Sequence, residues 1–381
     1  MNTAFITGVG HTRFGRLEGE GALDLMADAA SKALDDAQLR HGDIDGLLCG
    51  YATTLPHLML STLFAERFGL RPRYAHGMAL GGATGAAMLM LARDLVRVGR
   101  CSNVLVVAGE NRLTGQTRDS AIQTLAQVGD PDFEVPNGAS VPAYYALLAS
   151  RYMHATGLTQ DDLAQFAVLM RANAARHPQA HLQTPITTAD VAASKDIATP
   201  LRLLDCCPIS DGGMALVVSA KPGDKAAVSI IGAGQAHQHQ HLSALGDVMA
   251  TGASASADAA FGEASADRGA IDYLGIYDSF TITLAMLLEE IGFAPRGQSA
   301  NRVRDGSFAS DGVLPLNTHG GLLSFGHCGV AGGLGHTVEA VRQMRGEAGT
   351  RQVARLPRLA FVHADGGVLS SHVSLILSVA T

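Results

Sequence analysis

Short apolar runs alternate along this chain with longer segments in which apolar residues recur every three to four positions. Several of the runs are apolar on both faces, as strands buried between two helical layers must be. The runs lie at 4–10, 46–52, 103–110, 214–220, 227–234, 273–280, 359–367 and 373–380. The helical pattern is clearest at 22–39, 84–99, 281–292 and 336–346. This alternation predicts an α/β protein with a mixed or parallel sheet covered by helices.

Composition narrows the class of protein. Of the 381 residues, 47% are hydrophobic and 17% are charged, which suits a well-buried enzyme core and argues against disorder. The net charge of −7 gives no electrostatic reason to bind nucleic acid or an anionic membrane. No apolar run reaches the roughly 18 residues of a membrane-spanning helix, and the N-terminus lacks the pattern of a signal peptide.

The five cysteines are odd in number and irregularly spaced, which indicates reduced thiols and a cytoplasmic protein. No cysteine or histidine spacing matches a zinc site, so no metal is expected. The HQHQH run at 237–241 is expected to be a surface loop.

A composition shift near 219–229 predicts an N-terminal half, 1–222, and a C-terminal half, 223–381. A loop-and-helix domain at about 111–200 is expected to be inserted in the first half, to project from it and to shape substrate access. Residues 251–269 are small and polar, and predict an exposed loop or a weak surface helix. Each half contains a glycine-rich turn that opens a helix, which hints at duplication.

The turn of the first half, in HGMALGGATGAAML, opens a helix but carries no strong nucleophile. A helix N-terminus carries partial positive charge and free N–H groups, so it favours an anionic nucleophile or an oxyanion. No Ser, Cys or Lys stands there, and Thr84 is the only nucleophile-type side chain in the turn. The turn could bind ligand, be structural, or be an active site without its nucleophile.

The turn of the second half lies in LPLNTHGGLLSFGHCGVAGG. Glycines let the backbone approach a ligand, and a histidine beside them is suited to acid–base work because it titrates near neutrality. Alternatively, such a histidine only caps the helix. The many small residues beside His319 and His327 favour a pocket for a bulky ligand.

This second turn resembles the GGxxxxGHPxGAxG loop of thiolases, and the resemblance extends over nearly the whole chain. SDGGMALVV at 210–218 and IYDSFTITLAMLLEEIGF at 276–293 are similar to thiolase segments in the same order. The chain is most similar to the sterol-carrier-protein type. The resemblance implies the thiolase fold, with duplicated βαβαβαββ halves in five α-β-α-β-α layers, and a homodimer. It also implies an acyl-CoA substrate, with coenzyme A as part of the substrate and no bound cofactor.

At the position of the thiolase nucleophilic cysteine this sequence has Gly82, and the second, C-terminal cysteine is also missing. The histidine of the GHxxG loop is kept as His327, and Tyr277 stands where the family has an amide. The candidate catalytic residues are His327 and Tyr277, together with Cys328, which directly follows His327 and could supply another thiol. The candidate substrate-binding residues are Gly82, Thr84, His319, Gly320, Gly321, Ser324, His363, Gly366 and Gly367.

A glycine cannot be acylated, so we expect a reaction at a carbon next to the thioester without a covalent intermediate. An aldol or retro-aldol reaction needs only a base, an acid and an oxyanion hole, and Tyr277 with His327 could supply the pair. Thiolase-like aldolases of steroid side-chain degradation react in this way with a small zinc-ribbon/OB-fold (DUF35-type) partner subunit. Those aldolases have a tyrosine at the GHxxG histidine, whereas this chain keeps His327.

Two other functions stay open at this point. One is acyl transfer of the acetyl-CoA acetyltransferase type through another thiol, such as Cys328. The other is a catalytically silent subunit that binds acyl-CoA or scaffolds a partner, which the loss of both cysteines favours and the retained His327 disfavours.

Overall fold

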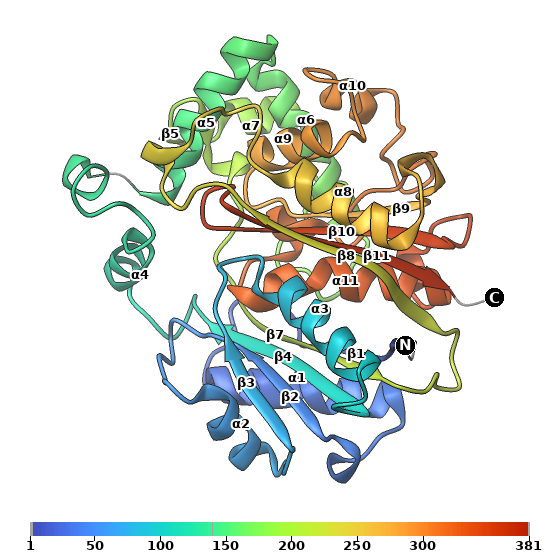
Figure 1. Cartoon of the computed structure of the whole chain (residues 1–381). Helices are drawn as coiled ribbons and strands as arrows, with labels where there is room; N and C mark the ends of the chain where they lie inside the picture. The colour runs from blue at the N-terminus through green and yellow to red at the C-terminus, as the bar shows by residue number, and fades with distance from the viewer. Residues whose placement is uncertain (1–2, 139, 380–381) are drawn as a thin grey trace.

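The computed structural model describes residues 3–138 and 140–379, and its main element is a nine-stranded sheet (Figure 1). The strand order is β3-β2-β4-β7-β1-β8-β11-β10-β9. The strands are β1 (Phe5–His11), β2 (Gly46–Gly50), β3 (Tyr74–Met78), β4 (Asn103–Asn111), β7 (Asp211–Ser219), β8 (Val228–His237), β9 (Tyr273–Ile276), β10 (Leu359–Gly366) and β11 (Ser371–Val379). Each predicted run contains a strand. The apolar pattern does not predict β3, because this edge strand reads YAHGM and is largely exposed.

The sheet consists of two halves with the same topology. In one half β2 is parallel to β4, and β7 and β1 follow antiparallel; in the other β9 is parallel to β10, and β11 and β8 follow antiparallel. β3 is parallel to β2, and Leu316 forms a single parallel bridge to Leu274 of β9 at the equivalent place. The halves join where β1 pairs with β8 at Phe5 and Ile6. The strand order therefore shows the duplication that the two glycine-rich turns hint at.

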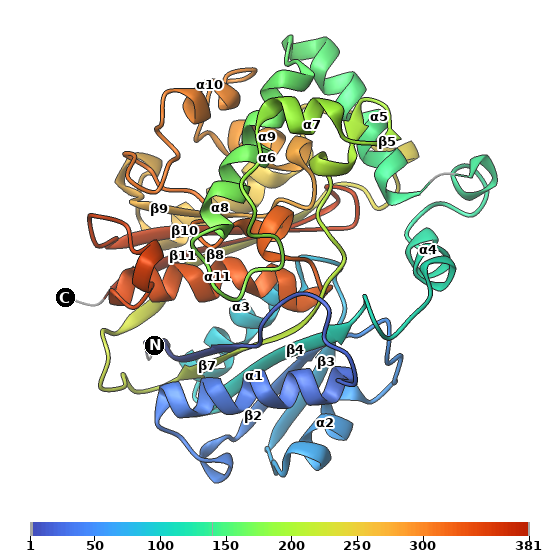
Figure 2. The same ribbon diagram turned by 180° about the vertical axis from the view of Figure 1, so that it is seen from behind.

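Helices α3 (Thr84–Arg97) and α11 (Val330–Arg345) lie against each other between the two halves, and each contacts strands of both (Figures 1 and 2). The helices of the outer layers are α1 (Ala22–Ala37) and α2 (Leu60–Phe68) on one half, and α8 (Ala253–Ala264) and α9 (Thr281–Ile291) on the other. This is the predicted α-β-α-β-α arrangement. Its central layer brings the N-termini of two buried helices together.

Helix α8 corrects the expectation of an exposed loop or weak helix at 251–269. Its Ala257 and Ala260 are fully buried, and it packs on β8 and β11. A Cβ atom at Gly232 of β8 would lie 2.2 Å from the carbonyl oxygen of Ala260. The small residues of this segment therefore allow close packing of helix on sheet.

The segment at 111–200 contains the helices α4 (Arg118–Ala126), α5 (Val141–Thr156), α6 (Gln160–Ala174) and α7 (Thr188–Ala193) and the strand β5 (Asp196–Ala198). Strand β6 (Leu201–Arg202) follows the segment directly and pairs antiparallel with β5. Helix α4 stands away from the body in both views (Figures 1 and 2). Helices α5 and α6 instead pack against α9, so this part of the segment covers the C-terminal half and does not project freely from the first. No helix in the described part of the chain combines the length and hydrophobicity needed to cross a bilayer.

Candidate active site

A cavity of about 280 Å³ lies at the N-termini of α3 and α11. Both halves and the segment at 111–200 contribute to its walls. Its apolar lining includes Leu125, Val128, Val141, Pro142, Ile209 and Phe280, and its polar lining includes Tyr51, Thr53, Glu110, Arg112, Tyr145, Cys206, Cys207, Tyr277, Ser279 and His327. An apolar cavity with a few convergent polar groups is the usual form of a small-molecule site.

The turn before α3 is closed by its own threonine. The Thr84 hydroxyl donates to the Gly81 carbonyl oxygen over 2.6 Å and accepts from the Leu80 N–H over 2.7 Å. Gly81 has φ +55°, a conformation that favours glycine. Thr84 is fully buried and does not line the cavity, so the structure gives its hydroxyl a role in the turn and not in substrate binding.

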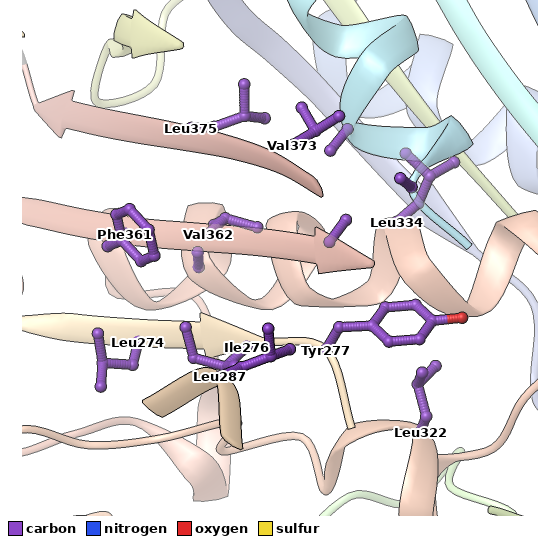
Figure 3. Close-up of a cluster of buried hydrophobic side chains, with 14 of the residues drawn as sticks. Leu274, Ile276, Tyr277, Leu287, Leu322, Leu334, Phe361, Val362, Val373 and Leu375 are labelled. Atoms are coloured by element: carbon purple, nitrogen blue, oxygen red, sulfur yellow. The ribbon is translucent and has the colours of Figure 1, made fainter. Parts of the chain in front are cut away.

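Tyr277 fills the space that Gly82 leaves empty. A Cβ atom at Gly82 would lie only 2.0 Å from the Tyr277 hydroxyl oxygen and 2.4 Å from its Cζ. Tyr277 follows directly on β9, and in Figure 3 its hydroxyl points away from the neighbouring aliphatic cluster. Asn317 fixes this strand end by bonding both the N–H and the carbonyl of Ile276. The phenol of Tyr277 thus occupies the volume that a side chain at position 82 would need.

His327 is held by the turn before α11. The Gly329 N–H donates to His327 Nδ1 over 3.1 Å, and His327 Nε2 lies 3.2 Å from the Tyr277 hydroxyl oxygen. Because Nδ1 accepts, the neutral ring carries its proton on Nε2 and donates it to Tyr277. Desolvation, and secondarily the charge of Arg112, lowers the pKa of His327 to about 3. The ring is therefore a neutral donor and not the group titrating near pH 7 that the sequence suggests.

The phenol of Tyr277 keeps its proton in the resting protein. Burial raises its pKa well above the ordinary value, and the Asp365 carboxyl acts in the same direction. Arg112 opposes this shift, and the N-terminus of α3 and the His327 Nε2–H also favour a negative charge on the oxygen. The site can therefore hold a proton on this oxygen and stabilise the anion left behind when the proton moves.

Sequence reasoning did not predict several polar residues of this region, among them Glu110, Arg112, Tyr145 and Asp365. Glu110 and Arg112 lie at the end of β4, and charged residues at the end of an otherwise apolar run could have revealed them. The Tyr145 hydroxyl donates to Asp365 Oδ2 over 3.0 Å, and burial raises the pKa of both groups. No local signal marks Tyr145, which the segment at 111–200 brings to the cavity.

Of the predicted site residues, Gly82, Tyr277, His327 and Gly367 line the cavity. Those that do not are Thr84, His319, Gly320, Gly321, Ser324, Cys328, His363 and Gly366. Cys328 is fully buried, and burial raises the pKa of its thiol well above the usual value. The structure thus does not bring this candidate nucleophile to the cavity.

The other residues outside the cavity have packing partners of their own. A Cβ atom at Gly321 would lie 2.0 Å from Asp278 Oδ2, and Ser324 accepts a bond from Arg171 Nε over 3.1 Å. His363 is buried and bonded on both ring nitrogens, to Ser374 over 2.8 Å and to His372 over 3.1 Å. His319 is also buried, and desolvation lowers its pKa to about 3. The contacts of these residues are thus with the protein around the cavity and not with its interior.

No group of three or more residues in the described ranges has the arrangement of a metal site. The other cysteines near the cavity are Cys206 and Cys207. Burial raises the pKa of Cys206 to about 12 and that of Cys207 further, so neither thiol is ionised at neutral pH.

Comparison with known families agrees with this architecture. The model described as "Thiolase, N-terminal domain" matches residues 4–221, and "Thiolase C-terminal domain-like" matches residues 234–379. Acetyl-CoA acetyltransferase of Methanothermobacter thermautotrophicus is 30% identical to this chain over 98% of this chain and 99% of its own length.

Two aldolases are also similar. Steroid side-chain-cleaving aldolase of Thermomonospora curvata is 33% identical over 90% of each chain. A solved structure described as "Ltp2-ChsH2(DUF35) aldolase" superimposes with a TM-score of 0.85 at 30% identity, covering 99% of this chain and 98% of the other. These matches confirm the predicted fold.

Proposed function

Because this chain belongs to the thiolase superfamily, we propose that it makes or breaks a carbon–carbon bond next to the thioester of an acyl-CoA without a covalent intermediate. The observation that carries the proposal is the Tyr277 hydroxyl, which occupies the space of a side chain at Gly82 and contacts His327. The names of the two similar aldolases support the same chemistry.

The site residues have distinct roles in the proposed retro-aldol reaction. The β-hydroxyl of the substrate loses its proton to a base and becomes the carbonyl of the released aldehyde or ketone. The electron pair of the bond between Cα and Cβ moves into the thioester enolate, and the Tyr277 O–H gives its proton to Cα. The His327 Nε2–H then stabilises the phenolate of Tyr277. In the condensing direction the Tyr277 O–H first loses its proton to solvent, and the phenolate, stabilised by the His327 Nε2–H, then removes the α-proton. Coenzyme A takes part only as a portion of the substrate.

Acyl transfer is the second candidate, because a similar protein is an acetyl-CoA acetyltransferase. It requires a thiolate that an acyl-CoA can reach, and Cys328 is buried away from the cavity. We expect Cys328→Ala and treatment with iodoacetamide to leave turnover within about threefold. A loss of activity on either treatment would favour acyl transfer.

The first test follows α-proton exchange. The protein is incubated with acetyl-CoA or propionyl-CoA in heavy water, and deuterium uptake at Cα is measured by mass spectrometry. We expect exchange with the wild type and with the control Tyr74→Phe at the sheet edge, but not with Tyr277→Phe. If acetyl-CoA binds by calorimetry without exchange, a silent binding subunit is favoured instead.

The assembly is also proposed. Strand β3 is one of the two edges of the sheet, and an open edge can pair with a second copy, so we propose a homodimer. The solved aldolase named with a DUF35 component supports a small zinc-ribbon/OB-fold partner subunit. The five free thiols support a cytoplasmic location. Light scattering of the pure chain, alone and after co-expression with a candidate partner, measures both assemblies.

A further inference from the structure

Two charged residues of the cavity have no role in the reaction described above. Glu110 is the second-to-last residue of β4, and Arg112 directly follows the strand. Both line the cavity. Their side chains are 2% and 10% exposed, and the two buried charges form an ion pair in which Arg112 Nε lies 3.9 Å from Glu110 Oε2.

One oxygen of Glu110 is fixed and the other is free. Oε1 accepts hydrogen bonds from the hydroxyl and N–H of Thr53 and from the N–H of Thr54. Oε2 is buried without a hydrogen-bond partner in the described part of the chain. A carboxylate that is oriented through one oxygen and has no hydrogen bond at the other is prepared to accept a proton or a hydrogen bond there.

Arg112 has unused donors. Its Nε is buried without a hydrogen-bond partner among the described residues, and the distance from Nε to Glu110 Oε2 is 3.9 Å. That distance is too long for a hydrogen bond. A buried guanidinium has five N–H donors to satisfy, so a polar ligand group is expected beside it.

We propose that Glu110 and Arg112 bind the β-hydroxyl group of the acyl chain, and that Glu110 removes its proton in the cleavage direction. A hydroxyl can donate to Glu110 Oε2 while it accepts from Arg112 Nε, which gives each of these atoms the hydrogen bond that it lacks. A carboxylate on the ligand would be repelled by Glu110, and a carbonyl would leave Oε2 without a donor. This inference rests on the proposed aldol function, whose cleavage substrate is a β-hydroxyacyl-CoA, and assigns the residues that bind its hydroxyl group and remove the proton.

The pair lies beside the proposed proton donor. A Cβ atom at Gly329 would lie 2.3 Å from Glu110 Oε2 and 3.8 Å from Arg112 Cδ, and the N–H of the same residue holds the His327 ring. The charge of Arg112 also lowers the pKa of both Tyr277 and His327. The hydroxyl-binding pair and the phenol therefore face one cavity.

The cleavage step balances with these groups. Glu110 Oε2 takes the hydroxyl proton, and the O–H electron pair forms the carbonyl of the released aldehyde or ketone. The bond between Cα and Cβ breaks, its electrons form the thioester enolate, and Tyr277 protonates Cα. The proton on Glu110 returns to the Tyr277 phenolate through solvent before the next turnover, so no oxidant or other reactant is needed.

The first experiment separates this inference from the proposed function. Cleavage of 3-hydroxybutyryl-CoA to acetyl-CoA and acetaldehyde is compared with α-proton exchange on acetyl-CoA, which involves no hydroxyl. We expect Glu110→Gln to slow cleavage about 10²- to 10⁴-fold and to leave exchange within about threefold. The control is Glu290→Gln, because Glu290 accepts the N–H and hydroxyl of Thr251 as Glu110 does those of Thr53 but does not line the cavity.

Unchanged cleavage in Glu110→Gln would overturn the inference, and an equal loss of cleavage and exchange would make Glu110 structural. Absence of α-proton exchange in the wild type would instead reject the proposed function.

The second experiment does not need turnover: calorimetry compares 3-hydroxybutyryl-CoA with butyryl-CoA in the Tyr277→Phe background. We expect the hydroxyl to strengthen binding roughly tenfold or more and Arg112→Gln to remove this difference. Equal binding of both ligands before Arg112 is replaced would overturn the inference.

Discussion

The turns before α3 and α11 occupy equivalent places in the two halves, yet they contribute to the site in opposite ways. The turn before α11 presents a side chain, the ring of His327, which Gly329 orients. The turn before α3 presents a space at Gly82, which the phenol of Tyr277 fills from the other half. A duplicated fold thus provides two helix N-termini, one that holds a hydrogen-bond donor and one that receives a group from elsewhere.

The difference also shows in what glycine does at each turn. At Gly82 the absence of a side chain is itself the requirement, because a Cβ atom would meet Tyr277. At Gly329 a Cβ atom would also lie too close to a neighbour, 2.3 Å from Glu110 Oε2, but the backbone is required as well, because φ is +66° and the N–H orients His327. A glycine-rich sequence alone does not distinguish these two requirements.

The largest effect on turnover is expected from a change at Tyr277, which contacts both turns. Tyr277→Phe keeps the ring and removes the proton that the site transfers, so we expect turnover to fall about 10²- to 10⁴-fold. The free energy of unfolding should change little, because only one hydroxyl is lost. Steady-state kinetics and urea unfolding measure the two quantities. Retained turnover would show that the phenol is only a space filler.

Gly82→Cys restores the thiol of the family to the first turn but leaves no room for the phenol. We expect turnover to fall about 10²-fold because the Tyr277 hydroxyl is displaced, and stability to fall by about 1–3 kcal/mol from overpacking. Combining Gly82→Cys with Tyr277→Ala should cost less stability than the sum of the two single changes. Additive costs, measured by urea unfolding, would mean that the two positions are not in contact.

His327→Gln tests the second turn. We expect turnover to fall roughly 10- to 10²-fold, since the residue stabilises the phenolate but does not transfer a proton. The control is His319→Gln, because His319 has the same low pKa of about 3 but is buried outside the cavity. It should leave turnover within about threefold.

His327→Gln and His319→Gln should change the pH dependence of stability in the same way. Each histidine has a folded pKa near 3, so as pH falls below about 6.5 the unfolded chain takes up the proton first. Stability is therefore retained above pH 6.5 and lost as pH falls toward 3, by up to about 1.4 kcal/mol per pH unit for each such histidine. Either replacement should make this decline shallower in urea unfolding between pH 4 and 7. An unchanged slope would contradict a neutral buried ring.

The smallest effect on activity is expected from Thr84→Val. The change removes the hydroxyl that accepts the Leu80 N–H, so we expect a loss of about 1–3 kcal/mol of stability with turnover within about threefold. A fall of a hundredfold or more in the folded variant would show that the Thr84 hydroxyl contacts the reacting group.

Much of the fold could be predicted because its signals are local. Apolar runs and helical periodicity predict every strand except the exposed β3 and the short β5 and β6, and the glycine-rich loop with His327 indicates the family. The same reasoning misjudged α8, where small residues allow close packing on the sheet and do not mark an exposed loop. It also did not foresee that the segment at 111–200 covers the C-terminal half.

The sequence by itself determined that position 82 has no side chain, that His327 is kept, and that a tyrosine follows the strand at 273–276. Only the tertiary structure decided that the Tyr277 hydroxyl fills the space at Gly82, that His327 donates to it, and that Thr84 and Cys328 do not face the cavity. The physical reason is that periodicity specifies which face of an element is buried. The contact between two side-chain tips depends on how two halves, distant in sequence, pack against each other.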